Sequence, residues 1–168
     1  MLIQHKAQRV GIFIDIQNLY HSAKNLYRAR VNYKELLKSL VSSRSLIRAI
    51  GYVVKSESAE GESAFFEALE KSGIELRMKD LQIFAGGMKK ADWDVGMAVD
   101  AIRMANSLDT VILVTGDGDF IPLVEYLKWG LGKEVEVAAF GRSASAKLKE
   151  TADFFIDLDR LPRVILKK

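Results

Sequence analysis

The chain has 168 residues, of which 49% are hydrophobic and 28% charged, so it can bury a sizeable core and is not expected to be disordered. It contains no cysteine and only two histidines, which excludes a disulfide scaffold, a cysteine nucleophile and a zinc site built from thiolates or several histidines. The net charge of +3 combines +8 over residues 1–55 with −5 over residues 56–168. A basic segment favours a polyanionic partner, although lysines scattered over the surface for solubility give the same count.

The organisation of the chain indicates one domain. Because no linker rich in proline, glycine or serine and no repeat divides it, we expect a single domain over residues 1–168, with a core at about 9–158 and a short tail at 159–168. No apolar run approaches the roughly 18 residues that a membrane helix needs. The chain also starts without an apolar leader. We therefore expect a soluble cytoplasmic protein without a membrane partner.

Strands and helices are predicted to alternate from the start of the chain. Residues 9–15 form an apolar run that ends on a carboxylate and predict a buried strand, and residues 17–29 predict a helix or long turn. Asn32 and Glu35 have the spacing of a capping box, which predicts a helix that continues to Leu40. The next predicted elements are a strand at 46–54, a helix at 63–72, a third strand from 74–79 and 81–85, and a loop at 86–90.

The second half continues the alternation. A long helix is predicted at 92–107, with Asp92 as its N-cap. The residues at helical spacing that should face the core are Val95, Ala98, Val99, Ile102 and Ala105. A central strand at 110–115, a helix at 121–129 with Pro122 in its first turn, a fifth strand at 135–140, a helix at 144–151 and a last strand at 154–158 follow. This pattern predicts a three-layer α/β/α fold with a mostly parallel sheet of five or six strands.

Four carboxylates lie at the ends of these predicted elements. Asp15 ends the first strand, Asp117 and Asp119 follow the central strand, and Asp94 is in the first turn of the long helix. If the two strands are neighbours, the acids converge on one crevice at the carboxyl edge of the sheet, where they repel one another unless a cation is present. Oxygen ligands suit Mg²⁺ or Mn²⁺. Asp100 is rotated roughly 120° from Asp94 and cannot point into the same site.

Each of these acids also has an ordinary structural explanation. Asp15 and Asp117 could bond turn amides, Asp94 could favour the positive end of its helix dipole, and Asp119 could cap the helix that follows it. The residues alone leave both explanations open.

Several motifs occur in a fixed order along the chain. Residues 13–18 are FIDIQN, residues 90–100 are KADWDVGMAVD, residues 115–120 are TGDGDF, and a closing segment runs from Gly141 and Arg142 to Phe155. Their order and spacing resemble those of NYN domains, a group of PIN-like nucleases, and among these the bacterial LabA-like proteins. The resemblance spans about residues 9–158. It implies a PIN-like sheet with strand order 3-2-1-4-5, in which the first and fourth strands are adjacent.

The resemblance also implies Mg²⁺- or Mn²⁺-dependent hydrolysis of RNA phosphodiester bonds, with the metal held by Asp15, Asp94, Asp117 and Asp119. Asn18 could bond a metal-bound water or a phosphate oxygen, or instead cap the helix that begins there. The hydroxyl of Thr115 could bind phosphate or orient Asp117.

Single-stranded RNA requires cations along a groove and surfaces for stacking. The candidate phosphate-binding residues are Lys24, Arg28, Lys90 and Arg142. For Tyr20 and Tyr27, spaced seven residues apart on one helix, core packing is favoured over stacking on bases. Trp93 fits either role.

The sequence is also compatible with functions other than ribonuclease activity. A non-catalytic module that binds RNA or a regulatory protein could use the same fold, and a homodimer or a protein partner is also compatible with the sequence. A haloacid-dehalogenase phosphatase should end its first strand in D-x-D, and here Asp15 is followed by Ile16 and Gln17. The sequence does not distinguish RNA from DNA as the substrate.

Overall fold

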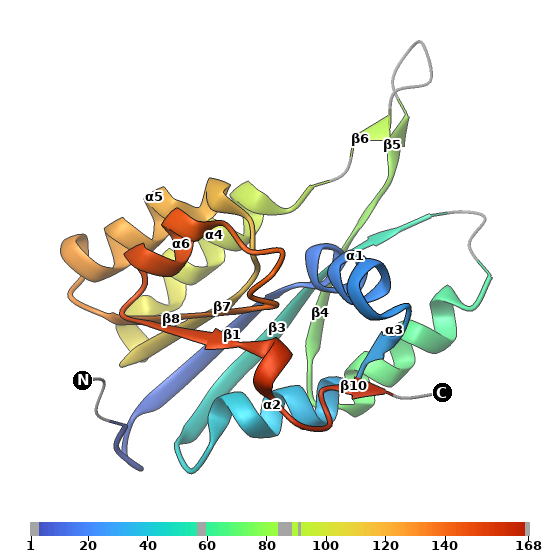
Figure 1. Ribbon diagram of the computed structural model, residues 1–168. Coiled ribbons are helices and arrows are strands. Elements are labelled where there is room, and N and C mark those ends of the chain that lie inside the picture. Colours follow the sequence, from blue (N-terminus) through green and yellow to red (C-terminus); the bar gives the residue numbers. More distant parts are fainter. Residues whose placement is uncertain (1–3, 57–59, 84–88, 91, 167–168) are drawn as a thin grey trace.

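A six-stranded parallel sheet forms the centre of the protein (Figure 1). The computed structural model describes residues 4–56, 60–83, 89–90 and 92–166. The strand order is β4-β3-β1-β7-β8-β9. These strands are β1 (Arg9–Asp15), β3 (Ser45–Lys55), β4 (Glu75–Asp80), β7 (Thr110–Val114), β8 (Glu134–Ala139) and β9 (Phe154–Asp157). The α/β fold is confirmed: the predicted order 3-2-1-4-5 is present, and the last predicted strand adds a sixth beside the fifth.

The two central strands bring the ends of β1 and β7 together. All five residues of β7 are buried, and five of the seven residues of β1 are buried. Both faces of a parallel sheet are covered by helices, which explains these nearly continuous apolar runs. Ile14 pairs with Val114 in the parallel register of β1 and β7. Asp15 and Thr115, the next residue of each segment, therefore lie side by side at the carboxyl edge.

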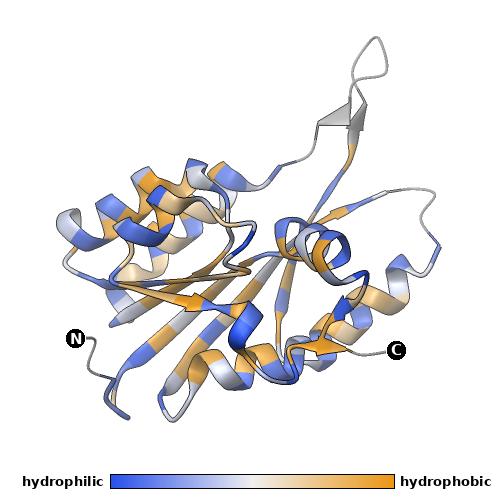
Figure 2. Ribbon diagram, in the orientation of Figure 1, coloured by the Kyte–Doolittle hydropathy of each residue, from blue (hydrophilic) through white to orange (hydrophobic). Residues whose placement is uncertain are grey.

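Helices cover both faces of the sheet, and their apolar sides point inward (Figure 2). One face packs against α1 (Ile16–Tyr27), α2 (Tyr33–Val41) and α3 (Glu62–Lys71). The other packs against α4 (Asp94–Met104), α5 (Ile121–Glu125) and α6 (Ala146–Thr151). The predicted cap of α2 is present, because the side chain of Asn32 accepts a hydrogen bond from the Glu35 N–H at 3.2 Å. None of the helices in the described ranges has the length and apolar character needed to cross a membrane.

Short elements complete the fold. Two antiparallel pairs lie outside the main sheet: β2 (Arg30–Val31) with β10 (Ile165–Leu166), and β5 (Gln82–Ile83) with β6 (Lys89–Lys90). The 3₁₀ turns are η1 (Ala105–Ser107), η2 (Gly118–Phe120) and η4 (Leu158–Arg160), and the π-helical turn η3 (Tyr126–Gly130) extends α5. The loop predicted at 86–90 is wrong at Lys89 and Lys90, which form β6, while residues 84–88 lie outside the described residues. A strand of two residues is too short to show the alternation of apolar and polar side chains from which a strand is predicted.

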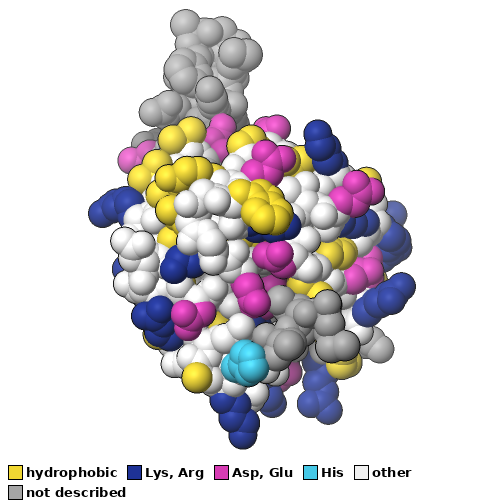
Figure 3. All heavy atoms as spheres, turned by 90° about the vertical axis from the view of Figure 1, so that its left-hand side faces the viewer, with side chains coloured by type: hydrophobic (Ala, Val, Ile, Leu, Met, Phe, Trp, Pro, Cys, Tyr) yellow, Lys and Arg dark blue, Asp and Glu magenta, His cyan; other side chains and the backbone are white. Residues whose placement is uncertain are grey.

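The orientation of α4 differs from the prediction. Val95 is 76% exposed, and Val99 and Ile102 are also exposed. Ala105 is buried as predicted, and the helix turns Met97 and Asp100 toward the sheet. This arrangement is stabilised because Asp100 accepts hydrogen bonds from side chains of β3 and β4. Figure 3 shows hydrophobic side chains exposed on the face formed by α4, α5 and η3.

Candidate metal centre and active site

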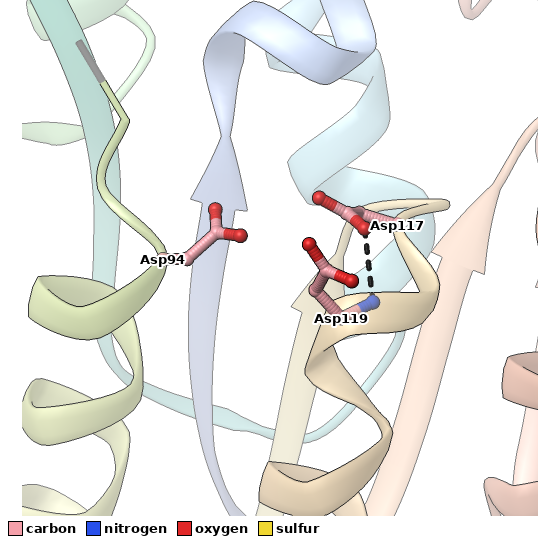
Figure 4. Close-up of side chains that lie close together, drawn as sticks. All are labelled: Asp94, Asp117 and Asp119. Atoms are coloured by element: carbon pink, nitrogen blue, oxygen red, sulfur yellow. Dashed lines mark hydrogen bonds between the residues drawn. The ribbon is translucent and has the colours of Figure 1, made fainter. Parts of the chain in front are cut away.

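Three carboxylates converge at the carboxyl edge of the sheet. Asp94 extends from the first turn of α4, Asp117 from the loop after β7, and Asp119 from η2. One carboxylate oxygen of each lies within 4.8 Å of the others. The three side chains point toward one another (Figure 4). The structure thus brings together three of the four acids expected from the sequence in one cluster, which we call the acidic cluster.

The loop that carries Asp117 and Asp119 is fixed by a side-chain hydrogen bond to its own backbone and by close packing at two glycines. The side chain of Asp117 accepts a hydrogen bond from the N–H of Asp119 at 2.9 Å and so caps η2. A Cβ at Gly116 would lie 3.1 Å from the backbone of Ala144, and one at Gly118 would lie 3.0 Å from Ser145 Oγ. Only a residue without a side chain fits this close approach easily. The carboxylate of Asp119 joins the acidic cluster, and Phe120 occupies the N-cap position of α5.

Asp15 lies beside the acidic cluster and is tied to it by hydrogen bonds. One of its oxygens accepts from the N–H of Asn18 at 3.2 Å, and the other accepts from the hydroxyl of Thr115 at 3.2 Å. The Thr115 hydroxyl in turn accepts from the N–H of Asp117, and the Asn18 amide oxygen accepts from the N–H of Gly116. Asp15 therefore caps α1 and also fixes the loop that carries the other acids.

Burial and mutual repulsion raise the pKa of two of these acids. Burial is the largest cause at Asp15, and the charges of Asp117 and Asp92 add to it. The pKa of Asp94 is raised to about 6, first by burial and then by the charges of Asp117, Asp92, Asp15 and Asp119. Carboxylates that repel one another in this way are stabilised by a cation. Because the donors are all carboxylate oxygens, they fit a hard divalent ion such as Mg²⁺ or Mn²⁺.

We expect the Asp94→Asn variant to be more stable than the wild type without metal, at pH values above about 6. A carboxyl group whose pKa is raised by folding contributes stability below its unfolded-state pKa, and this contribution is lost as the pH rises through the folded-state pKa. The gain in Tm should therefore shrink toward pH 4. Thermal unfolding in EDTA over pH 4–8 tests this, with Asp80→Asn, at an exposed aspartate, as the control. Parallel Tm curves for wild type and Asp94→Asn would contradict the expectation.

The predicted substrate-binding residues lie in different environments. Thr115 is buried, and its hydroxyl bonds Asp15 and the loop. Lys24 and Arg28 are exposed at the second half of α1 and at its C-cap. Arg142 forms an ion pair with Asp159 at 3.1 Å and stacks on the ring of Tyr27. Lys90 lies in β6. These placements show that Arg142 already has a partner, whereas Lys24 and Arg28 face solvent.

Three residues of the helix motif have structural contacts. Asp100 is 1% exposed, accepts from the Tyr52 hydroxyl at 2.8 Å and forms an ion pair with Arg77 at 2.5 Å. The indole N–H of Trp93 donates to the Val53 carbonyl at 2.8 Å. The predicted N-cap at Asp92 is wrong, because α4 begins at Asp94 and its N-cap is Trp93. The exposed Asp92 instead precedes the cap and accepts from the N–H of Asp94 at 3.1 Å.

The sequence pattern does not predict the pair of cationic side chains that lies beside Trp93. Arg77 and Lys79, both on β4, lie over its ring with their charged groups 5.4 and 4.7 Å from the centroid. The two residues are spaced two apart, so they lie on the same face of an edge strand whose exposed, charged side chains are otherwise ordinary. Only the contact with Trp93, which depends on the tertiary structure, sets them apart from other exposed cations.

Comparison with known proteins shows the family of the chain. The NYN domain family model matches residues 9–159, a range that contains all four acids. The chain therefore belongs to the NYN domain family, which is part of the PIN-like nuclease superfamily. It is similar to the "Low amplitude and bright protein LabA" of Synechococcus elongatus, with 25% identity over 96% of this chain and 90% of that protein. The crystal structure of a Vibrio parahaemolyticus protein of unknown function has a TM-score of 0.87 and 30% identity, covering 98% of this chain and 100% of the other.

Proposed function

We propose that this protein is a ribonuclease that hydrolyses phosphodiester bonds of single-stranded RNA with Mg²⁺ or Mn²⁺. The observation that carries the proposal is the convergence of Asp94, Asp117 and Asp119 within 4.8 Å, beside the half-buried Asp15, in a chain of the NYN family. Carboxylates this close together repel one another, as the raised pKa of Asp94 shows. A divalent ion supplies the missing charge.

The residues of the site have distinct roles in this proposal. Asp94, Asp117 and Asp119 would hold the metal, with Asp15, fixed by Thr115 and Asn18, as a fourth ligand. A divalent ion bound there would activate water and neutralise the charge that develops on the scissile phosphate. The amide oxygen of Asn18 is engaged by Gly116, which leaves its NH₂ group to donate to a phosphate oxygen.

Single-stranded RNA is favoured over duplex by the placement of the site. The acids lie at the carboxyl edge of the sheet, and the backbone of a flexible single strand can bend toward them more easily than that of a stacked duplex. Lys24, exposed on α1, and Arg28, exposed at its C-cap, belong to the basic segment of residues 1–55 and are the candidates for contacts with flanking phosphates. RNA rather than DNA is proposed because the family resemblance implies it.

Incubation of a labelled single-stranded RNA with the protein and Mn²⁺ tests the proposal. We expect cleavage that EDTA and the Asp119→Asn variant both abolish, that persists in Asp80→Asn, and that is slower on duplex RNA. Cleavage that survives both EDTA and Asp119→Asn would indicate a contaminating nuclease. Retention of RNA without turnover, with either metal and several sequences, would contradict the enzyme and support a binding module.

A further inference from the structure

The registers of three parallel strands place Arg77 in line with Asp15 across the carboxyl edge of the sheet. Asp15 of β1 pairs with Tyr52 of β3, and Tyr52 pairs with Arg77 of β4. Two strand spacings separate Asp15 from Arg77, which corresponds to about 10 Å between their backbones. Lys79 follows two residues later on β4, so its side chain leaves the same face of the sheet, closer to the carboxyl end of the strand. Lys79 therefore lies at the same edge of the sheet as the acidic cluster.

The ring of Trp93 lies between this part of β4 and the acidic cluster. Trp93 directly precedes Asp94, and its indole N–H donates to the carbonyl of Val53 at 2.8 Å. Its ring also packs on that of Tyr52, with centroids 5.4 Å apart. A Cβ at Gly96 would lie 2.6 Å from the Trp93 ring, so a larger residue there would displace the ring. These contacts fix the ring one residue before a carboxylate of the cluster.

The two cations over this ring differ in what holds their charge. Arg77 is bound to the carboxylate of Asp100 in an ion pair of 2.5 Å. The ammonium group of Lys79 lies 4.7 Å from the centroid of the Trp93 ring, and the residue is exposed. Among the residues that the structure describes, this ammonium group forms no hydrogen bond or ion pair. Lys79 therefore presents a positive charge and free N–H donors beside the site, while the charge of Arg77 is already neutralised.

We propose that Lys79 binds a phosphate of the RNA strand that flanks the scissile phosphodiester bond, on the β4 side of the acidic cluster. The inference rests on the proposed function. Three carboxylates carry more negative charge than one divalent ion neutralises, so beyond the metal-bound phosphate the cluster repels the RNA backbone. A flanking phosphate on this side requires a cation, and Lys79 supplies it. The Trp93 ring also limits the rotation of the lysine side chain, which reduces the entropy that this side chain loses on binding.

The RNA strand can continue outward along β5 and β6. β5 begins two residues after the end of β4, and Figure 1 shows the two short strands extending beyond the carboxyl end of β4. β6 consists of Lys89 and Lys90, and Lys90 pairs with Gln82 of β5. The predicted phosphate-binding residue Lys90 therefore lies on the same side of the acidic cluster as Lys79, farther out along the chain that follows β4.

The salt dependence of RNA binding tests Lys79 directly. The parent is the Asp119→Asn variant, which should leave a labelled single-stranded RNA intact in the presence of Mn²⁺. Adding Lys79→Gln should weaken binding several-fold at low salt and reduce the slope of log affinity against log salt by about 0.7, the value of one phosphate contact on a single strand. Lys79→Arg should restore both, because arginine keeps the charge and also stacks on aromatic rings.

The matched control is Lys71→Gln, which removes the same charge from a lysine in the last turn of α3 that is 75% exposed. This variant should leave the slope unchanged, because the chain from Lys71 leads into the amino end of β4, away from the acidic cluster. The Tm of each variant is measured in parallel. A lysine that only stabilised Trp93 would change the Tm and not the slope, and that result would overturn the proposal.

Uncharged methylphosphonate linkages identify the phosphate. Oligonucleotides with one such linkage at successive positions are bound to the parent and to the parent with Lys79→Gln. We expect a position near the bond that the wild type cleaves at which the linkage weakens binding to the parent but not to Lys79→Gln. In the otherwise wild-type protein, Lys79→Gln should raise KM and leave kcat nearly unchanged, because a flanking phosphate is bound equally in the ground state and the transition state. Equal losses in both proteins at every position would overturn the contact.

The two proposals fail in different ways. Wild-type cleavage of RNA together with an unchanged affinity and salt slope in Lys79→Gln would overturn the phosphate contact and leave the ribonuclease in place. RNA binding that depends on Lys79, in a wild type that cleaves no RNA with either metal, would overturn the ribonuclease and keep Lys79 as an RNA contact. A wild type that neither binds nor cleaves RNA would overturn both.

Discussion

The Asp117→Asn variant is expected to cleave RNA at least about a hundredfold more slowly than the wild type while keeping its fold. Asparagine retains an oxygen that can accept the hydrogen bond from the N–H of Asp119, so the cap of η2 survives. It removes the negative charge, and the stabilisation that a metal ligand supplies to a phosphoryl transition state is worth several kcal/mol. About 2.7 kcal/mol corresponds to a hundredfold in rate. Initial rates on one RNA at saturating Mn²⁺, with Tm measured in parallel, test this.

The control for this experiment is Asp100→Asn, in the same family motif as Asp94. Asp100 is buried and bonds Tyr52 and Arg77, so its replacement should cost on the order of 2 kcal/mol of stability. Activity below the unfolding temperature should change little, because the carboxylate lies outside the acidic cluster. Equal loss of rate in both variants, or a large loss of stability in Asp117→Asn, would contradict the assignment of roles.

Much of the fold follows from local sequence patterns. Apolar runs such as those of β1 and β7 predict buried parallel strands, and the spacing of Asn32 and Glu35 predicts the start of α2. Carboxyl ends of neighbouring parallel strands meet at one edge, so the acids that follow two strands were expected to converge. This reasoning located the candidate site because it depends on strand order and not on side-chain detail.

What the sequence did not predict depends on contacts between distant segments. Helix α4 has two faces that are apolar enough to pack against the sheet. The face that carries Asp100 is turned inward, where Asp100 accepts hydrogen bonds from Tyr52 of β3 and Arg77 of β4. Asn18 was expected to cap a helix or meet substrate, yet its amide oxygen bonds Gly116, 98 residues away. Arg142 was assigned to phosphate, and its ion pair with Asp159 depends on how η4 lies against the end of β8. No local spacing encodes such partners.

A buried ion pair far from the acidic cluster is expected to have the largest effect on stability. Arg44, after α2, and Glu136, on β8, are 1% and 0% exposed, and two hydrogen bonds of 2.6 and 3.1 Å join them. The guanidinium group also donates to the carbonyls of Leu40 and Val41. Because the guanidinium group donates four hydrogen bonds in the core and neither side chain is exposed to water, removal of one partner leaves an uncompensated charge there.

Arg44→Met should therefore lower the free energy of unfolding by about 3–5 kcal/mol, since it strands the carboxylate of Glu136. The double variant Arg44→Met with Glu136→Leu should regain most of that loss, because two apolar side chains of similar volume need no partner. The matched control is Arg48→Met, which breaks the exposed pair of Arg48 with Glu75, 46% and 54% exposed. An exposed pair contributes at most about 1 kcal/mol. Urea unfolding of the three variants measures these differences, and a double variant as unstable as Arg44→Met would show that packing around Arg44, and not the unpaired charge, causes the loss.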